Sequence, residues 1–334
     1  MGRFFVKRLL SIIPLLLIVL VIIFSITHLI PGDPATVLLG PGATESQISA
    51  LRDQLNLDKP LLEQFYLYVI GLFKGDMGNS LKTGQPVLDE LKLRLPATIE
   101  LSVFALFLAA LIGVPLGVTN AIWKNTLVDH FGRLTSLIGV SAPAFWLALL
   151  LQLLFANLLH LLPVAGRMDP YIRYEPVSGF LIVDSILSGN WVMLVDAIKH
   201  LILPSMVLAA FLGATIARFI RTSMLEVMGE DYTRTAYAKG LSKLGVITKH
   251  VLRNSLLPAI TITGLKFAEM LGGAILTETV FSWPGMGRFM FEAIKNRDYP
   301  VIQGTTMVFA LIYILTSLLI DVMYSFLDPQ IRVS

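Results

Sequence analysis

The sequence predicts an all-α membrane protein with about six transmembrane helices. Hydrophobic residues make up 55% of the 334 residues and charged residues only 15%, whereas a soluble domain carries about 25% charged residues. The mean hydropathy is +0.74. A spanning helix needs about 20 mostly apolar residues. Six stretches meet this requirement: Leu9–Ile30, Ala97–Ala121, Thr135–Leu159, Leu201–Ile220, Ala259–Phe281 and Val301–Phe326.

The distribution of basic residues predicts the orientation of these spans. Six spans place both chain ends on the same side, together with residues 122–134 and 218–258. That side carries 13 basic and 5 acidic residues, and the positive-inside rule therefore predicts cytoplasmic termini. The first apolar run is too long for a cleaved signal peptide, and no A-x-A site follows it.

The spans divide the chain into three predicted regions. Residues 1–30 form the N-terminal tail and first helix, residues 31–96 an external segment, and residues 97–334 a five-helix core. In the external segment, Thr44 and Gln47 have the spacing of a capping box. Leu61–Phe73 is apolar but short, which favours a helix lying in the membrane interface. The external loop at 160–200 fits either a plug or an interface.

The cytoplasmic segment 221–258 is far longer than a simple connection between membrane helices. It predicts a short helix over Tyr232–Lys239, which Gly240 ends because glycine accepts a sharp exit from a helix. A second helix follows and ends near Pro258, with three apolar residues on one face: Leu244, Ile247 and Val251. The small residues of the first helix would let it sit as a rigid knob in a groove of another protein. The alternative is that the segment is a solvated basic loop.

The chain lacks the motifs of several enzyme classes. It contains no cysteine, which excludes disulfides, thiolate metal sites and cysteine nucleophiles. No G-x-x-x-x-G-K-[ST] phosphate loop occurs, so nucleotide binding would require another chain. No G-x-S-x-G or H-E-x-x-H motif occurs either, which disfavours a membrane-embedded enzyme. A net charge of +3 without a basic patch gives no indication of nucleic-acid binding.

Two groups of motifs resemble one family of transport proteins. Asp231-Tyr-Thr-Arg-Thr-Ala-Tyr-Ala-Lys-Gly240, with Arg253-Asn-Ser-Leu-Leu-Pro258 after it, resembles the "EAA" loop of ABC-importer permeases. Arg234-Thr235-Ala236 stands at the Glu-Ala-Ala positions, a departure typical of the dipeptide and oligopeptide branch. Stretches elsewhere agree with that branch in their order: Pro31-Gly-Asp-Pro34, Leu55-Asn-Leu-Asp-Lys-Pro60, Pro96-Ala-Thr-Ile-Glu100, Ala274–Gly285, Arg297-Asp-Tyr-Pro300 and Asp328-Pro-Gln-Ile-Arg332.

The resemblance implies the transmembrane domain of a type I ABC importer in a bacterial inner membrane. The implied partners are a second permease chain, two cytoplasmic ATPase subunits that bind ATP and magnesium, and an external solute-binding protein. No cofactor is expected in this chain. Dipeptides or short peptides are the expected cargo, although glutathione, haem or nickel complexes fit the same architecture. The resemblance assigns ATPase coupling to Asp231, Arg234, Thr235, Ala236, Gly240 and Pro258.

Ionisable groups inside the spans are a further candidate site, because charges in a membrane are costly and often functional. Lys266 and Glu269 are three residues apart and can pair on one helix face. Glu269, Thr277 and Glu278 are expected to line the pathway, where the glutamates would contact a peptide ammonium group. The alternatives are self-pairing without ligand contact, or a gradient-driven transporter that uses Lys266, Glu269 and Asp321. No inverted repeat supports the latter.

Overall fold

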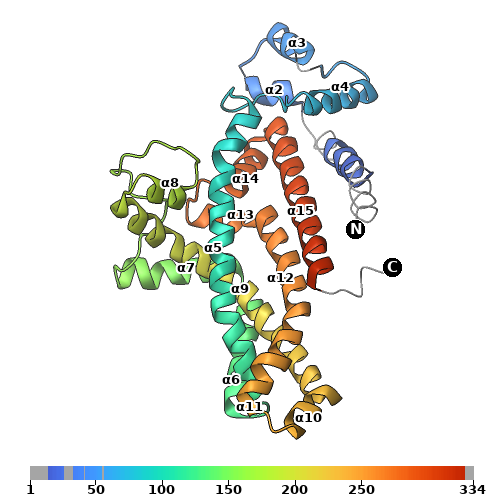
Figure 1. Ribbon diagram of the computed structural model, residues 1–334. Coiled ribbons are helices and arrows are strands. Elements are labelled where there is room, and N and C mark those ends of the chain that lie inside the picture. Colours follow the sequence, from blue (N-terminus) through green and yellow to red (C-terminus); the bar gives the residue numbers. More distant parts are fainter. Residues whose placement is uncertain (1–13, 26–32, 41, 55, 328–334) are drawn as a thin grey trace.

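The computed structural model of the chain describes residues 14–25, 33–40, 42–54 and 56–327. Within these ranges the chain is helical, and its β-pairing is confined to one isolated bridge between Asn79 and Pro86. Figure 1 shows an elongated bundle with a cap of short helices at one end and another group of short helices at the other. The predicted all-α class is confirmed.

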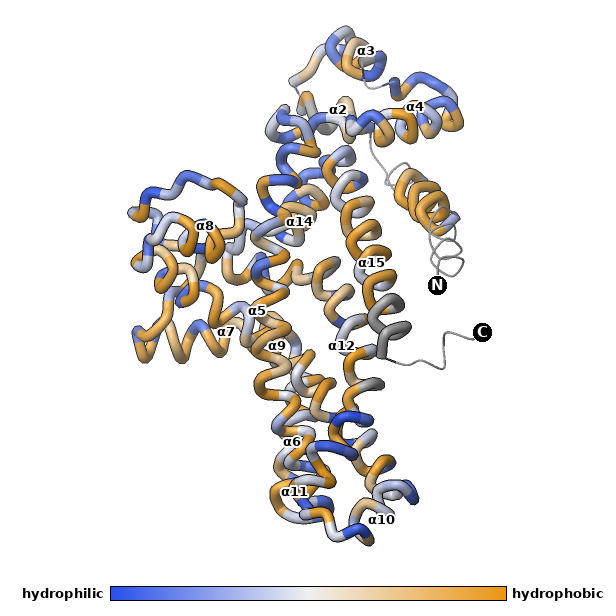
Figure 2. The backbone as a smooth tube through the Cα atoms, in the orientation of Figure 1, coloured by the Kyte–Doolittle hydropathy of each residue, from blue (hydrophilic) through white to orange (hydrophobic). Residues whose placement is uncertain are grey.

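Three long helices form the frame of the bundle: α5 (Val87–Ile122), α9 (Trp191–Gly229) and α15 (Tyr299–Leu327). The 39 residues of α9 correspond to about 58 Å at 1.5 Å per residue. A bilayer core is only about 30 Å thick, so α9 extends beyond it. Figure 2 shows hydrophobic residues predominating along the middle of α15 and along α7.

Small residues allow α5 and α9 to pack closely, and this is the most extensive helix contact in the described chain. A Cβ atom added to Gly113 would lie 2.5 Å from the carbonyl oxygen of Gly213. One added to Gly117 would lie 2.6 Å from the carbonyl oxygen of Ala217. Close backbone approach through small residues is typical of membrane helices, which lack a strong hydrophobic driving force between them.

The third predicted span is not one straight helix. The region consists of α6 (Leu127–Ser141), α7 (Ala144–Leu151) and the π-helical segment η1 (Gln152–Leu158). The chain bends by 106° between α6 and the helix that follows. The cause is Pro143, which disfavours helical geometry in the residue before it. Ala142 accordingly has an extended ψ of 129°, and the predicted span Thr135–Leu159 is broken there.

The fifth predicted span also differs from the structure. Helix α12 covers Arg253–Gly273, and α13 (Ile275–Val280) follows after a break at Ala274. The prediction that a cytoplasmic helix ends near Pro258 is wrong, because Pro258 lies inside α12. Packed membrane helices tolerate proline where local π-helical adjustment and neighbouring helices compensate for the lost hydrogen bond. Here the π-helical segment η2 (Ile247–Leu252) directly precedes α12.

The number of spans remains partly a prediction. By length and composition, α5, α9 and α15 can each cross a membrane, and the bent pair of α6 with α7–η1 can form a fourth span. Helix α12 is less apolar than these three and carries Lys266 and Glu269. Of the predicted first span Leu9–Ile30, the structure describes an apolar helix at Pro14–Ser25, and the remainder lies outside the described residues.

The segment predicted to be external folds as a cap of three helices: α2 (Pro34–Leu39), α3 (Glu45–Gln54) and α4 (Leu61–Phe73). The predicted capping box is present, since Gln47 Oε1 accepts a hydrogen bond of 2.9 Å from Thr44 N. Helix α4 has the predicted bounds and no buried residue, with Leu62 83% exposed. Helix α5 begins at Val87, so the last residues of the predicted external segment belong to the frame.

Buried charges anchor the segment 160–200, the second loop predicted to be external. Glu100 on α5 pairs with Arg167 at 2.6 Å. Asp184, on the short helix α8 (Leu181–Leu187), accepts hydrogen bonds from Tyr174 and Ser178. Burial alone would raise the pKa of Asp184, but the hydrogen bonds from Ser178 and Tyr174 outweigh it and hold this pKa below its usual value. The loop is therefore an ordered structure on the bundle surface.

Candidate functional site

The segment after α9 forms a compact helical tip. Its helices are α10 (Asp231–Ala238), α11 (Lys243–Val246), η2 and the start of α12. Glu230 has an extended ψ of 148° and turns the chain between α9 and α10. Figure 1 places α10 and α11 at the end of the bundle opposite the cap of α2–α4. The predicted short helix before Gly240 is confirmed.

Gly240 ends α10 in the way that its residue type predicts. Its φ is +80°, a region that glycine adopts without the steric cost that other residues meet. Gly240 N donates to Tyr237 O at 2.9 Å, and Leu241 N donates to Ala236 O at 3.4 Å. This pair of bonds is a Schellman motif. It fixes the direction in which the chain leaves α10.

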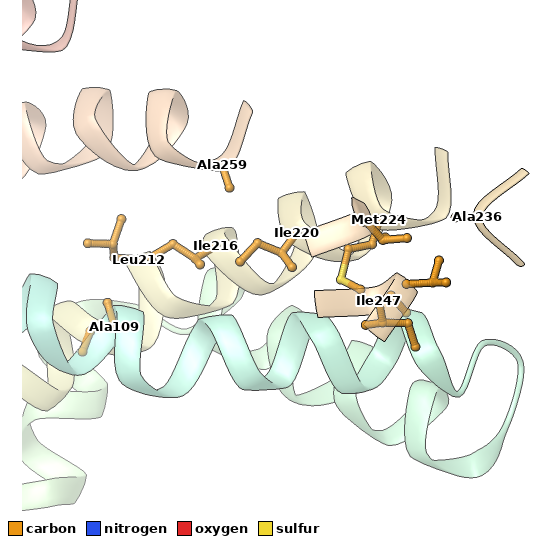
Figure 3. Packing of buried hydrophobic residues seen from close by; sticks show 12 residues of the cluster. Ala109, Leu212, Ile216, Ile220, Met224, Ala236, Ile247 and Ala259 are labelled. Atoms are coloured by element: carbon orange, nitrogen blue, oxygen red, sulfur yellow. The ribbon is translucent and has the colours of Figure 1, made fainter. Parts of the chain in front are cut away.

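One face of α10 packs on the protein itself. Thr233 is buried, and its hydroxyl donates to Val227 O at 2.8 Å. Ala236 is 5% exposed and belongs to a cluster with Met224 and Ile247; Figure 3 shows Ala236 at the end of this cluster. Ala236 therefore holds α10 in place and does not face a partner directly.

The remaining surface of α10 is exposed in this chain. The side chains of Asp231 and Arg234 are 96% and 74% exposed and lie 3.4 Å apart. Thr235 is also exposed. Tyr232 and Tyr237 are 44% and 42% exposed. These two tyrosines were not among the predicted site residues, although an exposed tyrosine is itself a signal because interfaces are enriched in tyrosine.

The second half of the tip departs from the prediction at one position. Ile247 and Val251 are buried as expected, but Leu244 is 71% exposed. The expected common face fails because the chain changes at Ile247 from α-helical to π-helical hydrogen bonding, which alters the residue spacing per turn. A hydrogen bond of 3.1 Å from the Asn254 side chain to the Tyr232 hydroxyl ties α12 to α10.

A buried ion pair braces the same end of the bundle. Arg221 on α9 donates from Nε and Nη2 to the two carboxylate oxygens of Asp129 on α6, at 2.7 and 2.8 Å. Asp129 is fully buried and also accepts a hydrogen bond from Asn125 N. The pair links α6 to the last turns of α9, just before α10. Sequence reasoning missed it because the partners are 92 positions apart.

The charges of the fifth predicted span behave in two different ways. Lys266 and Glu269 form the predicted pair on α12, at 2.7 Å, with side chains 27% and 54% exposed. Thr277 and Glu278 are buried, with 2% and 0% of their surface exposed. This burial does not support the expectation that they line a pathway. The side chain of Asp321 lies outside the described part of the structure.

Glu278 has a structural role that explains its burial. Its carboxylate accepts hydrogen bonds from Thr98 Oγ1 at 2.8 Å and from Arg288 N at 2.9 Å. Arg288 is in the first turn of α14 (Met286–Asn296). A carboxylate at a helix N-terminus is stabilised by the free backbone N–H groups there. Glu278 therefore fastens α14 to α5.

An apolar cavity lies between the four central helices. Its volume is about 490 Å³, and α5, α9, α12 and α15 all contribute to its wall. The lining is aliphatic apart from Phe267, Thr263 and Thr316. Glu269 is not among the lining residues, so the ion pair of α12 faces another direction.

The comparisons with known proteins identify the family. Residues 113–333 match the model of the binding-protein-dependent transport system inner membrane component, and residues 1–102 match its N-terminal membrane component. The chain belongs to this family. It is therefore a multi-pass permease component of an ABC importer.

Individual relatives agree with this assignment over nearly the whole chain. The dipeptide transport system permease protein DppB of Alkalihalophilus pseudofirmus is 46% identical over 99% of this chain and 100% of its own. The probable D,D-dipeptide transport system permease protein DdpB of Escherichia coli K12 is 46% identical over 94% of this chain and 92% of its own. The glutathione transport system permease protein GsiC of Salmonella paratyphi A is 40% identical over 99% of both chains.

A solved structure supports the fold. An inward-facing form of the MetNI methionine ABC transporter matches with a TM-score of 0.54 and 13% identity, covering 71% of this permease and 96% of that chain. The predicted type I importer fold is confirmed at the level of architecture.

Proposed function

We propose that this permease forms half of the pathway through which an importer carries dipeptides or other short peptides across a bacterial inner membrane. The other half is a second, related permease chain. An external solute-binding protein delivers the peptide, and both termini of the chain lie in the cytoplasm. ATP and magnesium bind to two cytoplasmic ATPase subunits, and this chain neither binds nor hydrolyses nucleotide.

The shape of the tip is the observation that carries this proposal. A solvated loop would not need a buried inner face, whereas α10 has Thr233 and Ala236 packed inside and a Schellman motif at its end. Its outer face presents Arg234, Thr235 and two tyrosines. A helix that is packed on one side and exposed on the other can transmit a movement of a partner to α9 as a rigid body.

The names of the relatives support peptide cargo. Two of the relatives reported above are described as dipeptide permeases and one as a glutathione permease. Glutathione is itself a short peptide, so all three descriptions fall within one chemical class. Family membership disfavours gradient-driven transport by Lys266, Glu269 and Asp321, because members of this family depend on a binding protein.

Reconstitution of the complete importer tests the proposal. The permease, its companion chain, the ATPases and the binding protein are placed in proteoliposomes with a radiolabelled dipeptide. We expect uptake that requires both ATP and the binding protein. Uptake by this chain alone, driven by a proton gradient without ATP, would contradict the proposal.

A further inference from the structure

The Lys266–Glu269 pair occupies an unusual position for two charges. Lys266 follows the first residue of α12 by 13 positions and precedes the last by 7. At 1.5 Å per residue these intervals are about 20 and 10 Å. Because α12 belongs to the fifth predicted span, the pair is expected within the depth of the membrane. The side chain of Glu269 is nevertheless 54% exposed. Ionised groups at this depth normally face a water-filled cavity or the interior of a bundle, because lipid solvates charge poorly.

Exposed polar residues also lie between the pair and the tip on two neighbouring helices. On α12, Asn254 is exposed as Glu269 is, about 22 Å before it along the helix and about 60° away around the axis. On α9, Arg218 and Thr222 are exposed one turn apart. Lys266 Nζ lies 5.9 Å from the ring centre of Phe211 on α9, which joins the two helices into one face.

A different face of the bundle shows what a lipid-facing surface looks like. On α5, Val103, Phe107 and Leu111 recur every four residues and are 51%, 59% and 58% exposed. This stripe carries no charge. Although Phe211 beside the pair is itself 41% exposed, the contrast favours water at the Lys266–Glu269 pair in the assembled importer and lipid at the α5 stripe.

The pair itself contributes little to stability. An ion pair between exposed side chains is weak, since each charge keeps much of its water. Lys266 and Glu269 can therefore exchange their mutual contact for contacts with a ligand that carries both charges. A peptide with free ends is such a ligand, with an ammonium group at one end and a carboxylate at the other.

We propose that Lys266 and Glu269 form an exchangeable ion pair in the translocation route, where Glu269 binds the ammonium group and Lys266 binds the carboxylate of a passing zwitterionic peptide. This inference rests on the proposed transport of peptides. It makes the two side chains specificity-determining residues of the permease. Lys266 and Glu269 then select peptides by their charged ends and do not discriminate among peptide side chains.

Thiol labelling tests the position of the pair. The chain contains no cysteine, so Glu269→Cys introduces a single thiol into this subunit of the complete importer. Phe107→Cys is the matched control, with similar exposure on the apolar stripe of α5. We expect a charged, water-soluble methanethiosulfonate to modify position 269 at least about tenfold faster than position 107, because charged reagents do not partition into lipid. Equal, slow labelling of both positions overturns the proposal.

Uptake measurements test the charge recognition. Glu269→Gln and Lys266→Gln importers are given three dipeptides: one unmodified, one acetylated at its amino end and one amidated at its carboxyl end. Each rate is divided by the wild-type rate for the same peptide, which cancels selection by the binding protein. Concentrations are chosen at which wild-type uptake of each peptide is measurable.

We expect Glu269→Gln to lower uptake of peptides with a free amino group about tenfold and to spare the acetylated peptide, because a hydrogen bond to a charged group is worth about a tenfold change or more. Lys266→Gln has the opposite pattern, sparing the amidated peptide. The control is Lys59→Gln with Glu63→Gln, an exposed ion pair at the start of α4 in the cap. Equal effects on all three peptides overturn the proposal, whereas a wild-type importer without ATP-driven peptide uptake refutes the proposed function itself.

Discussion

Replacing Asp129 by asparagine removes the charge that Arg221 needs in the interior of the bundle. The guanidinium keeps its position beside α6 but loses a bidentate carboxylate at 2.7 and 2.8 Å. Breaking a buried ion pair on one side costs about 3 to 5 kcal/mol, since a buried charge is left uncompensated. The Arg221 side chain is 18% exposed, so some water reaches it, and we expect the lower end, about 3 kcal/mol.

The change can be followed as the apparent melting temperature of the purified importer in detergent. In domains of about 150 to 250 residues, 1 kcal/mol corresponds to a shift of roughly 2 to 4 °C. On this scale Asp129→Asn should melt about 6 to 12 °C below the wild type. Asp89→Asn is the matched control. Asp89 pairs with Lys92 at 3.3 Å, but both side chains are about two-thirds exposed, and such pairs contribute at most about 1 kcal/mol.

A double variant separates the ion pair from other effects of the substitution. Asp129→Asn combined with Arg221→Met removes both charges, so it should be less destabilised than Asp129→Asn alone. A melting temperature for Asp129→Asn within about 1 °C of the wild type, far less than the expected shift, contradicts the reasoning. So does a double variant whose loss equals the sum of the two single losses.

Three further predictions concern other parts of the bundle. Gly240→Ala should lower stability by about 1 kcal/mol, because a residue with a Cβ atom is strained at φ +80°. The control Gly229→Ala, at the end of α9 and with open space around it, should be neutral in the same thermal assay. Gly113→Val should prevent assembly of the importer, measured by co-purification of the ATPases, because its Cβ would meet the backbone of α9 at 2.5 Å; Gly42→Ala, which meets no atom within 4 Å, should assemble normally. Asp184→Asn should loosen the second external loop, seen as faster hydrogen exchange at neutral pH. The pKa of Asp184 is lowered in the folded state. Its stabilisation of the loop is therefore present above the unfolded pKa of about 3.9 and is lost as pH falls from there through the folded pKa. The exchange rates of wild type and variant should converge in acid, and a difference that persists below both pKa values contradicts this.

Local signals made parts of the fold predictable from sequence. The capping residues Thr44 and Gln47 fixed one helix start, and the apolar run Leu61–Phe73 had the bounds of α4. Gly240 ended the tip helix because glycine is the residue that this backbone conformation favours. In each case the decisive interaction lies within a few residues along the chain, where a sequence pattern can reveal it.

Features that depend on tertiary contacts were not predictable in the same way. Pro143 bends its helix by 106°, whereas Pro258 is accommodated inside α12, and the sequence around each proline does not distinguish the two outcomes. In the sequence, Glu278 is a charge inside a predicted span and was therefore expected in the pathway. In the structure it accepts a hydrogen bond from Thr98, which is 180 positions away along the chain. The Asp129–Arg221 pair also forms only after folding brings distant segments together.

Site-specific cross-linking from α10 tests most directly whether the tip contacts an ATPase subunit. The wild-type chain has no cysteine, so Arg234→Cys and Thr235→Cys can each carry a thiol-linked photo-crosslinker in the assembled importer, with Lys74→Cys in the external cap as the control. We predict that positions 234 and 235 cross-link to an ATPase subunit and that position 74 does not. Labelling of positions 234 and 235 by an impermeant reagent added outside intact cells, with no cross-link to an ATPase, would contradict the account.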